Sequence, residues 1–228
     1  MKLFANSVLL SIALLSFTGC GGGSSSNDAV TTPSTPSTPT TPTTTTNYQG
    51  LYGVGATNAG TATVSSTGAY TYGYNGTNID LSPSGLSAAN VISLTSNGVK
   101  EVIGGSTYSY SRFGGVAPST DLTKSQVFYV GTKTTTMPTT GTATYSGQVV
   151  DSSLANSAVT FNVNYGAKTI TGTSSALTFS NGTISGSDFT GNVSGNGTFK
   201  GSFFGTNAAE LGGTGTTAGN AFSFGAKK

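Results

Sequence analysis

Short runs of alternating apolar and polar residues, separated by Gly and Asn, constrain the fold of this chain more than any other feature of its sequence. In residues 158–166, AVTFNVNYG, the side chains of Val159, Phe161, Val163 and Tyr165 share one face. This two-residue period is typical of a β-strand with one buried face. The same character is found in residues 69–75, 107–113, 141–150 and 197–205. Because no segment after Tyr48 has a convincing helical period, we predict an all-β fold.

Asn-Gly pairs lie between several of these runs and indicate how the strands are joined. Asn97-Gly98, Asn181-Gly182 and Asn196-Gly197 are pairs that two-residue hairpin turns prefer. Consecutive hairpins favour a meander that packs as a sandwich or closes into a small barrel. Closure has a physical motive, because charges and prolines that usually protect open sheet edges are scarce here.

The N-terminus has the pattern of an exported lipoprotein. A basic Lys2 precedes an apolar run at residues 8–17, which is too short to span a membrane, and Thr18-Gly19-Cys20 follows. We therefore expect residues 1–19 to be a lipoprotein signal peptide and Cys20, the single cysteine, to be lipidated, with palmitate among its acyl chains. Phe17 stands where Leu is usual, and an ordinary secretory signal is the alternative. Several acyl chains would hold the protein firmly on a membrane.

Residues 20–47 are expected to form a disordered linker. They are rich in Gly, Ser, Thr and Pro, and a proline recurs every third residue from Pro33 to Pro42. This spacing matches the three-residue turn of polyproline II, and the segment has almost nothing apolar to bury. It would act as a stalk between the membrane and the folded part.

The folded part divides near residues 132–140, TKTTTMPTT. We expect a β-rich region at 48–136 and a second β-region at 137–228. Each is small, so we expect the two to pack together and share stability.

The composition excludes several kinds of site. The chain contains no histidine, which removes His-based triads, the usual zinc motifs and histidine ligation of haem. Nine basic and seven acidic residues leave no basic stripe, so we expect no nucleic-acid partner. The carboxylates of the folded part form no recognisable pair for acid–base catalysis. They are Asp80, Glu101, Asp121, Asp151, Asp188 and Glu210. We predict that the protein is not an enzyme and has no metal site and no cofactor.

Several motifs of the C-terminal half resemble a known family. MPTTGTATYSGQVV, VNYGAKTITGT, GSFFGTNAAELGG and the closing AFSFGAKK look like the C-terminal barrel of transferrin-binding protein B. This barrel type is shared with factor H-binding protein, haemophilin-like proteins and other bacterial surface lipoproteins. The resemblance covers residues 137–228 well and is weaker for 48–136, which would correspond to the family's smaller handle.

The resemblance implies an eight-stranded antiparallel barrel and a lipid anchor in the outer membrane of a Gram-negative cell. It also implies frequent display on the cell surface by a surface-lipoprotein translocator, and binding of a host protein or of an iron or haem carrier. This chain departs from the family in having one lobe, short loops and few charges, which argues against transferrin itself as the partner. It also lacks histidine, on which haem capture in relatives commonly relies. A structural or adhesive surface lipoprotein without a soluble ligand is the alternative function.

Two groups of residues are the candidates for a functional role. Tyr108, Tyr110, Arg112 and Phe113 are ligand-binding candidates, because tyrosine can ligate iron and because Arg and aromatics are favoured interface anchors. Their alternative role is packing, with both tyrosines on one strand face. The second group is expected to mark the barrel and to be structural. It comprises Gly205, Asn207, Ala208, Glu210, Leu211, Gly212 and Gly213.

In this second group, Gly205-Thr206-Asn207 is predicted to turn the chain and Gly212-Gly213 to form a bend. Phe199 and Phe203 are predicted on one strand face and Phe204 on the other. Glu210 is expected to cap local backbone amides or to pair with a nearby lysine.

Overall fold

The computed structural model of the protein describes residues 46–49, 51–52, 60–65, 68–83 and 90–228. The predicted signal peptide, the predicted lipidation site Cys20 and nearly all of the predicted linker therefore lie outside the described residues. Within the described part, no helix is apolar and long enough to cross a membrane.

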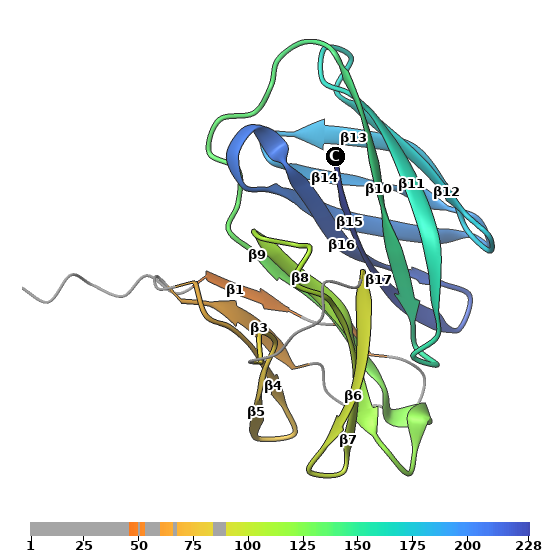
Figure 1. The fold of residues 1–228 in the computed structure, drawn as a ribbon. Coiled ribbons are helices and arrows are strands. Elements are labelled where there is room, and N and C mark those ends of the chain that lie inside the picture. The colour runs from red at the N-terminus through yellow and green to blue at the C-terminus, as the bar shows by residue number, and fades with distance from the viewer. Residues whose placement is uncertain (1–45, 50, 53–59, 66–67, 84–89) are drawn as a thin grey trace, which may run out of the picture. The chain divides into compact units, whose positions relative to one another are not determined.

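The C-terminal half is a closed barrel of eight antiparallel strands, as predicted (Figure 1). Each strand pairs with the next along the chain, and β17 pairs with β10 to close the barrel. The strands are β10 (Thr142–Asp151), β11 (Asn156–Asn164), β12 (Thr169–Ser174), β13 (Thr178–Ser185), β14 (Asp188–Val193), β15 (Gly197–Phe204), β16 (Glu210–Thr217) and β17 (Asn220–Lys227).

Aromatic side chains fill the barrel interior. The Phe179 ring lies 4.9 Å from Phe161 and 5.2 Å from Phe199, measured between ring centroids. Glycines on neighbouring strands make room for these rings: a Cβ on Gly213 would lie 2.4 Å from the ring of Phe224. The predicted bend at Gly212-Gly213 is therefore wrong, because β16 continues through both residues and this glycine serves packing.

The residues before the barrel form two smaller antiparallel sheets, which we call the handle. The first has the order β1 (Thr46–Gln49), β3 (Thr61–Val64), β4 (Tyr70–Tyr74) and β5 (Thr77–Asp80). The second has the order β2 (Leu51–Tyr52), β9 (Gln126–Gly131), β8 (Ser111–Pro118), β7 (Val99–Gly104) and β6 (Val91–Ser96). One hydrophobic cluster joins both sheets to Val150, Leu154 and Phe204 of the barrel, so the expected shared packing is confirmed.

Strand β15 contributes to both cores. Phe199 and Phe203 belong to the cluster inside the barrel, whereas Phe204 belongs to the handle cluster. The predicted division of these three phenylalanines between two faces is confirmed.

Two local predictions are wrong. The run 107–113 is not one strand, because residues up to Tyr110 lie in turns and bends and β8 begins at Ser111. Asn181-Gly182 is not a hairpin turn: both residues lie within β13, where the register shifts against β14 and Asn181 has a φ of 51°. Asn tolerates this left-handed conformation, which occurs in β-bulges as well as in hairpin turns, so the Asn-Gly pair did not distinguish the two. Asn97-Gly98 and Asn196 do lie where adjacent strands turn.

Glu101 on β7 supports a prediction about pH. Its side chain is only 6% exposed, and burial, with a smaller contribution from the charge of Asp80, raises the pKa of its carboxyl. At pH values between the ordinary and the raised pKa, the Glu101 carboxyl holds a proton in the folded state that it has lost in the unfolded state. The free energy of unfolding therefore falls as pH rises through this interval.

We expect Glu101→Gln to make the free energy of unfolding fall less steeply with pH, as measured by urea unfolding from about pH 4 to about pH 7. Part of the slope should remain, because burial also raises the pKa of Glu210. An unchanged slope in the variant would contradict the assignment to Glu101.

Candidate functional site

Phe113, a predicted ligand-binding residue, lies where the handle meets the barrel. Its side chain is fully buried and stands edge-on to Tyr108, with ring centroids 5.1 Å apart. A Cβ on Gly225 of β17 would lie 2.1 Å from the Phe113 ring, so the ring fits against the barrel only because this residue is glycine. Ser223, on the same strand, donates a hydrogen bond to the carbonyl of Gly114.

Arg112 is 8% exposed, and its hydrogen bonds are to backbone carbonyls within the protein. Its Nε donates to Leu81 at 3.1 Å, and its guanidinium also donates to Ser111 at 2.7 Å and to Tyr108. The guanidinium carbon lies 5.1 Å from the centre of the Tyr70 ring. These contacts use much of the donor capacity of the guanidinium and connect the two handle sheets.

Tyr108 is placed unfavourably for iron ligation. It is almost fully buried, and its hydroxyl donates a long hydrogen bond of 3.4 Å to the carbonyl of Gly225. Burial, and secondarily the charge of Glu210, raises the pKa of this hydroxyl. A raised pKa disfavours the deprotonated form in which a tyrosine ligates iron.

Tyr110 is the most accessible of the four candidates. It lines a cavity of about 390 Å³ together with Lys133 and the Gly205-Thr206-Asn207 turn. The structure thus brings the four residues together at the start of β8 and places Tyr110 on the wall of this cavity. Ligand binding at this group stays a prediction.

Glu210 connects the barrel to this same segment of the handle. Its carboxylate accepts hydrogen bonds from Ser109 N at 2.6 Å, Tyr110 N at 3.1 Å and Ser111 Oγ at 2.7 Å. The side chain is 4% exposed, and burial raises the pKa of the carboxyl despite these donors. Backbone amides do contact Glu210, as expected, but they belong to a segment about a hundred residues earlier in the chain, and no lysine pairs with it among the described residues.

The other signature residues have structural positions. Gly205 has a φ of 74°, and a Cβ there would lie 2.3 Å from the Tyr110 ring. It precedes the 3₁₀ turn η2 (Thr206–Ala208), where Asn207 has a φ of 54°. The carbonyl of Ala208 accepts a hydrogen bond from the Tyr145 hydroxyl, and Leu211 is buried in the barrel. The predicted turn at residues 205–207 is confirmed.

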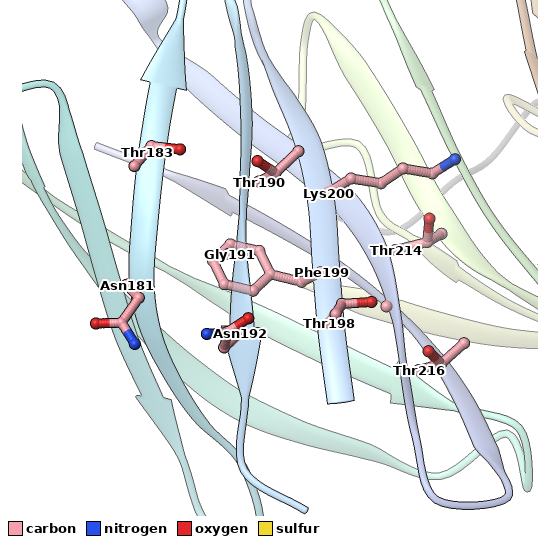
Figure 2. A pocket seen from close by; sticks show the side chains of 11 residues that line it. Asn181, Thr183, Thr190, Gly191, Asn192, Thr198, Phe199, Lys200, Thr214 and Thr216 are labelled. Carbon is pink, nitrogen blue, oxygen red and sulfur yellow. The ribbon is translucent and has the colours of Figure 1, made fainter. Parts of the chain in front are cut away.

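A larger cavity of about 610 Å³ lies along strands β13 to β16, and we call it the barrel-wall cavity. Figure 2 shows the side chains that line it, most of them ending in a hydroxyl or an amide. Register places two rows across the strands. The first row is Thr183, Thr190, Lys200 and Thr214, and the second is Asn192, Thr198 and Thr216.

No pattern in the sequence marked these residues as a site. Within each row the residues come from different strands, and only the registers of β13 to β16 make them neighbours. The one available signal was the alternation of Thr and Asn with apolar residues along these strands. The same alternation occurs on other strands, such as β11, so it does not single out a site. In the described part of the chain, no group of three or more acidic, Cys or His residues could hold a metal ion.

Comparison with protein families identifies the barrel. Residues 137–228 match the family described as C-lobe and N-lobe beta barrels of Tf-binding protein B. No curated protein matches the sequence.

Solved structures agree with this fold. Isotype 1 transferrin-binding protein B from serogroup B Neisseria meningitidis is 22% identical with a TM-score of 0.55, and the match covers 69% of this chain and 38% of that one. A point variant of the protein from Haemophilus parasuis is 24% identical with a TM-score of 0.55, covering 69% and 39%. A surface lipoprotein is 18% identical with a TM-score of 0.50, covering 79% and 98%.

The chain thus spans about 40% of the length of the intact transferrin-binding proteins that it resembles. The part that carries the family match is the closed barrel of β10 to β17 with its aromatic interior. Residues 137–228 therefore form a closed barrel that matches the family of transferrin-binding protein B barrels.

Proposed function

We propose that this protein is a lipid-anchored outer-membrane lipoprotein that faces the cell exterior and binds a host protein or an iron- or haem-bearing carrier. The family match of residues 137–228 carries the proposal, because the structures of similar fold include transferrin-binding proteins and a surface lipoprotein. Barrel and handle form the rigid scaffold, and the loops at their ends contact the partner.

The proposed organisation follows the sequence. Residues 1–19 are removed on export, Cys20 is acylated, residues 20–47 are the stalk, 48–136 are the handle and 137–228 are the barrel. A surface-lipoprotein translocator would deliver the chain to the outer leaflet. No reaction is assigned, because proteins of this family act by binding.

The anchor is tested by Cys20→Ser. We expect the variant to move from the outer-membrane fraction to the soluble fraction, because the acyl chains hold the protein on the membrane. Protease treatment of intact cells expressing the wild type should degrade the protein if it faces outward. Membrane partitioning that is unchanged in the variant would contradict lipidation at Cys20.

The binding role is tested by capture. The purified chain, immobilised, should retain a specific protein from serum, and added haem should shift its Soret band if haem is the ligand. The low charge and the Thr- and Asn-rich surface favour a structural or adhesive role as the second candidate. If no serum protein is retained and haem shows no Soret shift, the result would favour the structural or adhesive role.

A further inference from the structure

The geometry of the barrel-wall cavity points to a binding site for an acidic sugar, a polyhydroxylated ring that carries a carboxylate. This inference goes beyond the proposed capture of a protein or an iron carrier. It rests on the hydroxyl and amide rows, on an unpartnered buried hydroxyl and on the charge of the cavity.

The two rows provide closely spaced hydrogen-bonding groups. Neighbouring strands lie about 4.8 Å apart, so side chains opposed in register on adjacent strands stand at about the spacing of substituents across a sugar ring. Thr190 on β14 is opposed to Thr183 on one side and to Lys200 on the other, and Thr198 on β15 lies between Asn192 and Thr216. Threonine hydroxyls and asparagine amides both donate and accept, as sugar hydroxyls do. A volume of about 610 Å³ is within the range of small-molecule sites.

Thr214 provides the second observation. It lines the cavity and is fully buried, yet its Oγ1 has no hydrogen-bond partner. A buried hydroxyl without a partner is costly, and such groups are rare in folded proteins. A ligand oxygen at this end of the cavity would satisfy it.

Lys200 determines the charge of the ligand. Its ammonium group is the one cationic group of the cavity lining, and the lining contains no carboxylate. The nearest acidic residue along β14, Asp188, is already bound by Lys133 at 2.6 Å and by Ser202. Lys200 and Thr214 are opposed in register, and Figure 2 shows them at the same end of the cavity. Together they can donate to the two oxygens of one carboxylate once the Lys200 side chain turns toward it.

The test uses the methyl α-glycoside of N-acetylneuraminic acid and the methyl ester of the same glycoside, which lacks the charge. Titration of the ¹⁵N-labelled chain is followed by amide chemical shifts. We expect saturable shifts on β13 to β16 with a Kd of about 1 mM for the acid and at least about tenfold weaker binding of the ester. Raised salt should weaken binding of the acid, because the Lys200 interaction is exposed and screened.

Two variants test the residues. Lys200→Gln should weaken binding of the acid by about tenfold and leave the ester unaffected. Thr214→Val keeps the side-chain shape and removes the unpartnered hydroxyl. It should therefore leave stability unchanged or raised while weakening binding several-fold. The matched control is Lys100→Gln on handle strand β7, which should bind as the wild type does.

Equal binding of acid and ester, shifts outside β13 to β16, or no saturable shift up to about 10 mM would each overturn the site. Unchanged affinity in both Lys200→Gln and Thr214→Val would do the same. Because these measurements use a defined small glycoside and neither serum nor membranes, their failure is distinct from failure of the proposed surface anchoring or serum capture.

Discussion

Phe113→Ala is expected to lower the free energy of unfolding by about 3–5 kcal/mol, the range found when a fully buried phenylalanine is truncated. The ring occupies the space between Tyr108 and the backbone of Gly225, so its removal leaves a cavity where handle and barrel meet. Equilibrium urea unfolding of the purified chain measures the change.

The control for Phe113→Ala is Leu94→Ala on the edge strand β6. Leu94 is 36% exposed, so we expect a change within about 0.5 kcal/mol. A loss below about 1 kcal/mol for Phe113→Ala would contradict its place in the interior. Lost partner binding at unchanged stability would instead support the role of Phe113 as a ligand anchor.

Glu210→Gln is expected to lower the free energy of unfolding by about 1–3 kcal/mol. Gln retains one acceptor oxygen. The second carboxylate oxygen now accepts hydrogen bonds from the Tyr110 N–H and the Ser111 hydroxyl, and in the variant an amide nitrogen would take its place. The loss of a buried charge offsets part of this cost at neutral pH, since burial disfavours the ionised carboxylate. The cost outweighs this gain, because the amide nitrogen would be a donor facing the Tyr110 N–H, which would keep only its 3.2 Å hydrogen bond to the other oxygen.

A double-mutant cycle with Ser111→Ala tests the geometry of the Glu210 contact. Because Ser111 Oγ donates directly to Glu210, the two substitutions should be non-additive by at least about 0.5 kcal/mol. Ligand binding by the folded fraction of Glu210→Gln should be retained. Selective loss of binding without destabilisation would contradict a structural role for Glu210.

The sequence supported the barrel because its signal is local. In β11 the alternation of Val159, Phe161 and Val163 with polar residues is visible within nine residues, and the structure buries all three in the barrel. The same reasoning failed for residues 107–113, where alternating aromatics precede the strand. The Phe113 ring, on which Tyr108 packs, fits against Gly225, and Glu210 accepts a hydrogen bond from the adjacent Ser109 amide. Gly225 and Glu210 lie about a hundred residues later in the chain, so no local pattern indicates these contacts.

The all-β class, the turn at residues 205–207 and the two-sided role of β15 could be predicted from the sequence, since each follows from periodicity or from residues suited to a left-handed backbone. Tertiary structure alone decided which glycines serve bends and which make room for a ring, as Gly213 does for Phe224 and Gly225 does for Phe113. It also decided that Lys200 and Thr214 are neighbours. The physical reason is that ring contacts and cross-strand register join residues far apart in the chain, and no spacing along one strand encodes the partner on another.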